Sequence, residues 1–153
     1  MPYESLLRRD VIRAHGLTVE EISKRIVEMF AVIERHLQDV EATDISVDGR
    51  YNNTYGAARV AAEIVMMAEG FRPGRAYGNH AAVFAFLRAF PHEAWQMQAR
   101  LFDEARKKRN ILEYERANIV TQTELDTLRT QVERFLYEMK LWLQADHREL
   151  QPT

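Results

Sequence analysis

Two long stretches of this chain place apolar residues at steps of three and four, and this spacing constrains the fold more than any other feature. The first stretch contains Ile22, Ile26, Met29, Phe30, Ile33, Leu37 and Val40, and the second contains Leu125, Leu128, Val132, Phe135, Met139 and Trp142. Such spacing gathers apolar side chains on one face of a helix. Each stretch follows a capping box, Thr18 with Glu21 and Thr121 with Glu124, which predicts where each helix begins.

Four further segments have helical character, and turn residues separate them. The pattern predicts helices over about 3–15, 50–69, 79–90 and 92–112, with loops over 42–49 and 71–78. Asn79 is expected to cap the short helix that Pro91 ends, and alanines in the 50–69 helix allow a neighbouring helix to approach closely. In the 92–112 helix the inward residues are expected to be Ala94, Met97, Leu101 and Ala105.

No alternation typical of strands competes with this pattern, and the chain has neither an internal repeat nor a linker. The sequence therefore predicts an all-α, antiparallel up-and-down bundle of five to six helices, with residues 1–153 in a single domain. The polar residues after Ala145 are expected to fray.

Composition narrows the possible chemistry. The chain has no cysteine, which excludes a disulfide framework, a cysteine nucleophile and a thiolate metal site. Its 21 basic and 23 acidic residues give a net charge of -2, so contact with nucleic acid would need a local patch. No segment approaches the roughly 20 apolar residues of a membrane helix, and the N-terminus does not resemble a signal peptide. A soluble, cytoplasmic protein without membrane contact is expected.

Common catalytic and binding motifs are missing from the sequence. It has no Gly-rich phosphate loop, no Gly-x-Ser-x-Gly elbow and no Glu-x-x-His pair typical of di-iron bundles. Neither a cofactor nor a metal is therefore predicted. Residues 17–26 resemble the first helix of a helix-turn-helix reader, but the apolar stripe continues to Val40 without the required turn, which favours a plain bundle helix.

The densest positive charge is the run Arg106, Lys107, Lys108 and Arg109, inside a segment of six basic and four acidic residues at 100–116. Two interpretations stay open. The run is either a solvated helix face or a phosphate-binding patch, because guanidinium groups match phosphate oxygens well. Arg72 and Arg75, in the 71–78 loop, are the next candidates for contacts to phosphate.

A series of short strings resembles the HEPN superfamily. They are Asp48-Gly-Arg-Tyr-Asn-Asn-Thr-Tyr-Gly-Ala-Ala-Arg59, Gly70-Phe-Arg72, Gly78-Asn-His80 and Arg106-Lys-Lys-Arg-Asn110 with Tyr114. The likeness covers roughly residues 48 to 145 and rests on the order and spacing of the strings. It implies a small helical bundle that forms a homodimer. It also implies frequent ribonuclease activity and frequent membership of toxin–antitoxin or defence systems that include a partner protein.

The catalytic pattern of that family is an arginine, a polar residue, and a histidine after four to six intervening positions. Arg109 and Asn110 match, but Tyr114 stands where the histidine is expected. Tyrosine titrates near 10 and histidine near 6.5, so the altered motif is better suited to binding than to proton transfer. Arg109 and Tyr114 also lie about 140° apart around an ideal helix. For His80, a structural hydrogen bond to a loop carbonyl is favoured over catalysis.

Three functions follow as hypotheses. The first is binding of RNA or a nucleotide, centred on Arg109, Asn110 and Tyr114. The second is a ribonuclease with a variant site. The third is a non-catalytic protein-interaction module, such as the helical component of a two-component system.

Overall fold

Helices make up most of the described chain. The computed structural model describes residues 2–42, 44–114, 117 and 119–150, with the backbone alone for residues 113 and 114. The elements are α1 (Glu4–Arg8), β1 (Ile12–Ala14), α2 (Val19–Val40), α3 (Val47–Ala68), β2 (Phe71–Pro73), α4 (Asn79–Ala89), α5 (Glu93–Tyr114), α6 (Gln122–Asp146) and the short 3-10 helix η1 (Arg148–Leu150). The predicted all-α bundle is confirmed. Among the described residues, no helix is both long and apolar enough to cross a bilayer.

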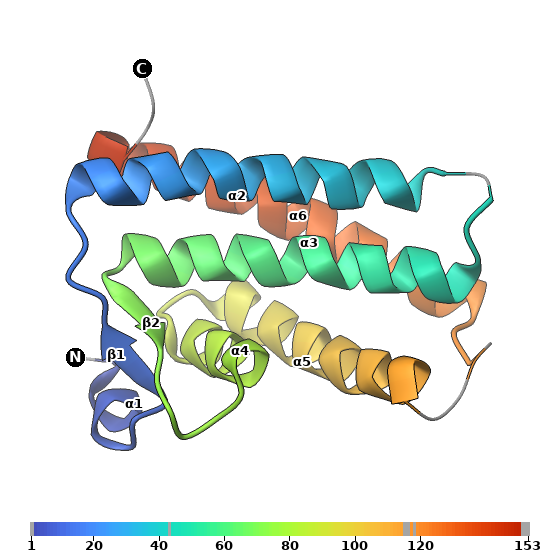
Figure 1. The fold of residues 1–153 in the computed structure, drawn as a ribbon, viewed down its shortest axis with the longest axis horizontal. Coiled ribbons are helices and arrows are strands. Elements are labelled where there is room, and N and C mark those ends of the chain that lie inside the picture. The colour runs from blue at the N-terminus through green and yellow to red at the C-terminus, as the bar shows by residue number, and fades with distance from the viewer. Residues whose placement is uncertain (1, 43, 115–116, 118, 151–153) are drawn as a thin grey trace.

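α3 is the central helix of the bundle. It lies between α2 on one side and α4 and α5 on the other, and α6 crosses behind it (Figure 1). Four alanines on α3 are completely buried, namely Ala57, Ala58, Ala61 and Ala62. Because an alanine side chain ends at Cβ, neighbouring helices can approach α3 closely on several sides. The predicted close approach is thus confirmed.

A chain of aromatic rings joins α3 to the helices below and behind it. Neighbouring ring centroids lie 5.2–6.2 Å apart along the series Tyr55, Phe84, Phe102, Phe135 and Trp95. All five side chains are buried. At one end, Trp95 Nε1 donates a hydrogen bond to Glu138 Oε2 at 3.1 Å, so its polar atom has a partner. At the other end, the hydroxyl of Tyr55 reaches the candidate site described below.

The prediction of a helix over 3–15 is wrong in its second half. α1 stops at Arg8, Asp10 takes a positive φ of 57°, and β1 follows. β1 pairs antiparallel with β2, so that Ile12 lies opposite Pro73. Val11 and Ile12 are buried by this arrangement. The pairing partner lies in the segment expected to be a plain loop, about 60 residues further along the chain, and local periodicity carries no signal for such a contact.

Two helix starts also differ from expectation. α3 begins at Val47 instead of near residue 50, because Ser46 caps it by accepting a hydrogen bond from the backbone N–H of Gly49 at 3.1 Å. Gly78, not Asn79, occupies the cap position of α4, and it supplies no side-chain hydrogen bond. By contrast, the two predicted capping positions at Thr18 and Thr121 are confirmed.

The predicted inward face of α5 is right for the buried Ala105 and the half-buried Leu101, but wrong for the first two residues named. Ala94 and Met97 face outward, and Met97 is 68% exposed, whereas Trp95, Ala99 and Phe102 are buried. Both sets of residues have helical spacing, and burial of the larger aromatic side chains decides between them. The expected fraying of the C-terminal segment is wrong as far as η1, because Leu150 is 2% exposed and belongs to the core.

α2 and α3 meet at a glycine. A Cβ atom at position 56 would lie 2.7 Å from His36 Cε1, so the absence of a side chain at Gly56 leaves room for the imidazole ring. The ring is also held by a 3.2 Å hydrogen bond between His36 Nδ1 and Asn53 Oδ1. The close packing of α2 on α3 at this point therefore depends on both residues.

Gly56→Ala should destabilise the protein by about 1–2 kcal/mol, because the new methyl group overpacks the α2–α3 contact. In a His36→Ala background the same change should be neutral, or stabilising by up to about 1 kcal/mol, since alanine favours a helix over glycine. Denaturant unfolding of the four proteins measures this double-mutant cycle. An equal effect of Gly56→Ala in both backgrounds would contradict the assigned contact.

Candidate functional site

His80 lies at the end of the aromatic series, where α4 begins. Its Nδ1 atom is 2.9 Å from the Tyr55 hydroxyl oxygen, and this contact replaces the loop carbonyl expected from the sequence. Burial raises the pKa of Tyr55 to about 12, so the hydroxyl keeps its proton at neutral pH. A buried tyrosine thus holds the imidazole in a defined position.

Three arginines from two helices surround His80. Arg109 Nε donates to Asn52 Oδ1 at 3.1 Å, and its guanidinium carbon lies 5.9 Å from the centroid of the Tyr55 ring. Arg106 Nε donates to Asp103 Oδ1 at 2.8 Å. On α3, Arg59 Nη1 donates to Glu63 Oε1 at 2.7 Å. Of these three contacts, the one between Arg109 and Asn52 joins α5 to α3, whereas Arg106 and Arg59 each form an ion pair within their own helix.

The charges of these arginines act on His80. Its pKa falls from 6.5 to about 4, first because burial disfavours the charged ring and then because Arg59, Arg109 and Arg106 repel an added proton. The same three arginines also lower the pKa of Tyr55, although burial outweighs them. At neutral pH the site therefore has an uncharged imidazole in a positive electrostatic environment.

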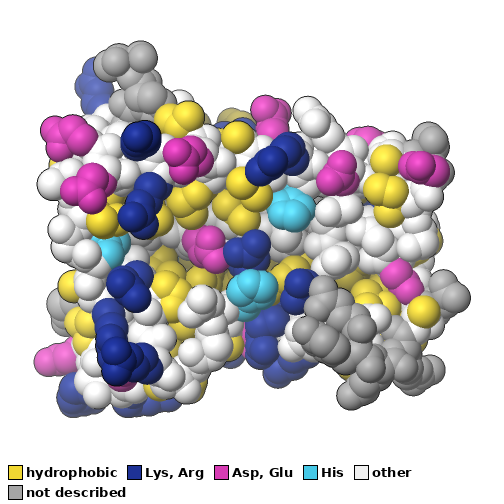
Figure 2. All heavy atoms as spheres, viewed as in Figure 1, with side chains coloured by type: hydrophobic (Ala, Val, Ile, Leu, Met, Phe, Trp, Pro, Cys, Tyr) yellow, Lys and Arg dark blue, Asp and Glu magenta, His cyan; other side chains and the backbone are white. Residues whose placement is uncertain are grey.

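An open hollow of about 390 Å³ adjoins this cluster. It is lined by Gly78, Asn79, His80, Ala81, Arg106 and Asn110. The cap and the first three residues of α4 are among these lining residues, and the glycine cap offers no side-chain oxygen to the first backbone N–H groups. The N-terminus of an eleven-residue helix also carries partial positive charge. In Figure 2, histidine and basic side chains gather near the middle of the visible face, over α3 and the helices below it.

The predicted basic run does not form one patch. Arg106 and Arg109, three residues apart on α5, are near His80, but their neighbours point elsewhere. Lys108 forms an ion pair with Glu124 of α6, and the 66% exposed Lys107 lies 3.9 Å from Asp103. Only half of the run therefore belongs to the candidate site, because consecutive residues on a helix point in different directions.

The other predicted residues have separate placements. Arg72 lies in β2 opposite Arg13 of β1, and Arg75 lies beside Asp10. The pKa of Asp10 is lowered mainly by its hydrogen bond with Arg13 and further by Arg75. Neither Arg72 nor Arg75 is among the charges that act on His80. Tyr114 is the last residue of α5, and its side chain lies outside the described part of the structure, so its pairing with Arg109 stays a prediction.

Three site residues on α3 were missed by the sequence reasoning. Asn52, Tyr55 and Arg59 are spaced three and four apart, so they share one side of the helix. This spacing could have indicated a shared site, because all three residues also lie in the 48–59 string that resembles the HEPN superfamily. Tyr55 is buried in the core, and its hydroxyl also positions His80.

Comparison with known protein families, curated proteins and solved structures finds no match to this chain. Among the described residues, no three His, Asp or Glu side chains lie together in a way that could hold a metal ion. Function is therefore argued from the geometry and charge of the site around His80.

His80 should titrate near pH 4 in an NMR experiment that follows its ring signals. Arg59→Gln should raise this pKa, because it removes the first of the repelling charges, whereas Lys107→Gln should leave it unchanged. Since the pKa in the folded protein lies below that of the unfolded chain, the stability contributed by neutral His80 is lost as pH falls from about 6.5 toward 4. A titration of His80 near its ordinary pKa would contradict the described environment.

Proposed function

We propose that this chain is a HEPN-type protein that binds single-stranded RNA through the phosphate backbone, at the site formed by His80, Arg106, Arg109 and Asn110. The observation that carries the proposal is the gathering of three arginines around a neutral histidine, beside the open N-terminus of α4. Basic side chains and the N-terminus of a helix both attract an anion.

Each group has a physical reason to favour a phosphate. Guanidinium groups donate in a fork that fits two phosphate oxygens. Backbone N–H groups at a helix N-terminus donate toward an anion, and the helix dipole adds to the attraction. The Asn110 side chain is exposed and lines the hollow, so its amide can donate as well. These contacts are independent of base identity, which predicts little sequence preference.

The shape of the hollow favours an RNA chain over a free nucleotide. Of the six residues that line it, His80 is the only one with a ring, so the described walls offer no second ring to enclose a base. The basic groups that act on His80 come from two helices, Arg106 and Arg109 from α5 and Arg59 from α3. A backbone with successive phosphates makes better use of this arrangement, and a mononucleotide that binds equally well would contradict it.

Binding of a short single-stranded RNA should weaken as salt concentration rises, because phosphate contacts release counterions. Arg109→Ala and Arg106→Gln should each lower the affinity and reduce the slope of log affinity against log salt by about 0.7 for one lost contact. Lys107→Gln is the matched control, since it removes a charge from the same helix but outside the site.

Fluorescence anisotropy with a labelled oligonucleotide measures all four proteins at several salt concentrations. Failure of the wild type to bind at low salt would remove the proposal and leave the protein-interaction module as the leading hypothesis. Equal losses for Lys107→Gln and Arg109→Ala would show non-specific attraction instead of a site.

Cleavage of the bound RNA is a second candidate, and His80 is the observation that favours it. We assign to His80, on another helix, the role of the histidine that the sequence motif lacks at position 114, because Tyr55 holds it near Arg109. Uncharged His80 can accept the proton of a ribose 2′-hydroxyl as that oxygen attacks phosphorus, although a pKa of about 4 makes it a weaker base than an ordinary histidine. The bond from phosphorus to the 5′-oxygen then breaks and water protonates the leaving oxygen. His80 returns its proton to the hydroxide that remains, and the products are a 2′,3′-cyclic phosphate and a 5′-hydroxyl.

If cleavage occurs, His80→Asn should lower the rate at least about 100-fold, which is typical for loss of a general base. RNA affinity should change less, because the arginines remain. The assay uses end-labelled RNA with a chelator present, and mass spectrometry identifies the cyclic phosphate. Absence of cleavage by the wild type, or full activity of His80→Asn, would remove this candidate and leave RNA binding intact.

A further inference from the structure

A second group of arginines lies where α1, β1 and β2 meet, and the proposed RNA site does not include them. They are Arg9 after α1, Arg13 in β1, Arg72 in β2 and Arg75 in the loop after β2, and we refer to them as the strand patch. Arg9, Arg72 and Arg75 are exposed, and Arg13 is half-buried. Figure 2 shows basic side chains gathered at its lower left, over α1 and the loop after β2. The strand patch is therefore a positively charged surface apart from the arginines around His80.

The strand patch places like charges opposite each other. Arg13 and Arg72 are paired positions of the two antiparallel strands, and two positive side chains at such positions repel each other. Asp10 offsets part of this repulsion, because its carboxylate accepts hydrogen bonds from Arg13 Nε at 2.7 Å and from Nη2 at 3.0 Å. Among the described residues, no carboxylate pairs with Arg72. The repulsion does not stabilise the fold, and an anionic ligand at this position would relieve it.

Main-chain contacts fix the loop that carries Arg75. The N–H of Gly74 donates to the carbonyl oxygen of Val11 at 2.8 Å, and that of Ala76 donates to the carbonyl oxygen of Asp10 at 2.9 Å. A Cβ atom at position 74 would lie 2.2 Å from the Asp10 carbonyl oxygen, so this approach requires glycine. Arg75 is therefore held between two anchored residues. A surface that is ordered before binding loses less conformational entropy when a ligand binds.

Tyr77 connects the strand patch to the hollow beside His80. Arg9 Nη2 donates to the Tyr77 hydroxyl at 2.6 Å, and the Arg9 guanidinium carbon lies 5.9 Å from the ring centroid. Tyr77 is still 40% exposed, and the next residue, Gly78, caps α4 and lines the hollow. Figure 1 shows the loop from β2 passing α1 before it reaches α4. An exposed ring in a defined position therefore lies between the two basic surfaces, and such a ring can stack on an unpaired base.

We propose that an RNA strand bound in the hollow continues across the strand patch, with one base stacked on Tyr77 and the neighbouring phosphates at Arg75 and Arg72. This inference rests on the proposed RNA binding and extends its site by a second set of contacts. The stacked base must be unpaired, which makes the extended surface selective for single-stranded over double-stranded RNA. An acidic protein segment would satisfy the arginines, but it would not need an exposed ring between the strand patch and the hollow.

Arg72→Gln and Arg75→Gln should each weaken the binding of a single-stranded RNA of about 12 nucleotides. Each should also reduce the slope of log affinity against log salt by about 0.7, because one phosphate contact is lost. Neither should change the affinity of an RNA of about four nucleotides, which occupies only the hollow. Arg109→Ala should weaken the binding of both RNAs, since Arg109 belongs to the site beside His80.

Arg25→Gln is the matched control, because it removes an exposed arginine from α2, outside both surfaces. Thermal unfolding separates lost binding from lost folding. Arg72→Gln should unfold at an unchanged or higher temperature, since the repulsion with Arg13 is relieved. An equal loss of affinity in Arg25→Gln, or unchanged binding of the longer RNA by both strand-patch variants, would overturn the proposal.

Tyr77→Ala should weaken binding of the longer RNA at least about 5-fold, because one stacked base is lost. Tyr77→Trp should retain the affinity, and the fluorescence of its new indole should be quenched as RNA binds. A duplex of the same length should bind equally to Tyr77→Ala and to the wild type. If Tyr77→Trp binds as weakly as Tyr77→Ala, or if the duplex is weakened as much as the single strand, the assigned stacking is wrong.

The two proposals fail in different ways. Weaker binding by Arg109→Ala, without any effect of the Arg72, Arg75 and Tyr77 variants, would remove the strand patch and leave the RNA site beside His80. Failure of the wild type to bind either RNA at low salt would remove both.

Discussion

The arrangement of the bundle depends on the central helix α3, which other helices cover on several sides. A helix in this position can be accommodated only if its side chains are small where neighbours come closest. Ala57, Ala58, Ala61 and Ala62 meet that requirement on the inner side, and Gly56 meets it where the His36 ring lies against α3. Because α2, α4, α5 and α6 all pack against α3, the backbone of α3 sets their positions relative to one another.

The candidate site is a consequence of this packing. Tyr55 points from α3 into the aromatic core, and only its hydroxyl reaches the start of α4, where His80 accepts or donates the hydrogen bond. The same close packing brings Arg109 of α5 within reach of Asn52 on α3. Positive charge accumulates around His80 because α3 and α5 each contribute arginines to one edge of the core. Aromatic packing and the electrostatics of the site are therefore coupled through Tyr55.

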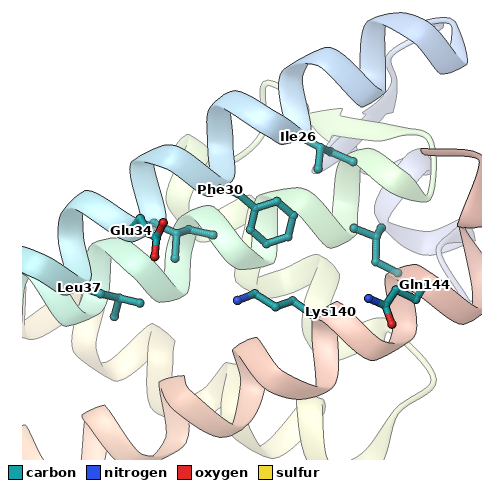
Figure 3. A pocket seen from close by; sticks show the side chains of 8 residues that line it. Ile26, Phe30, Glu34, Leu37, Lys140 and Gln144 are labelled. Carbon is teal, nitrogen blue, oxygen red and sulfur yellow. The ribbon is translucent and has the colours of Figure 1, made fainter. Parts of the chain in front are cut away.

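The proposed RNA site shares no lining residue with the apolar groove that Ile26, Phe30 and Leu37 of α2 form with Leu143 of α6 (Figure 3). The site lies where α3, α4 and α5 converge, whereas the groove lies between α2 and α6. Their surface chemistry differs accordingly. The first combines basic groups with backbone N–H donors, and the second is apolar with one acid and one base.

Local sequence determined the helices themselves: α2 and α6 begin at the predicted caps, Thr18 and Thr121, and carry the predicted stripes. These features depend on residues three or four positions apart, which local spacing reveals. Tertiary structure alone decided the pairing of β1 with β2, the division of the 106–109 run between two sides of α5, and the meeting of Arg59 and Arg109 around His80. Those outcomes depend on how far each helix is rotated against its neighbours. The rotation is set by the burial of large side chains such as Trp95 throughout the core. The spacing of residues within one helix carries no information about these contacts between helices.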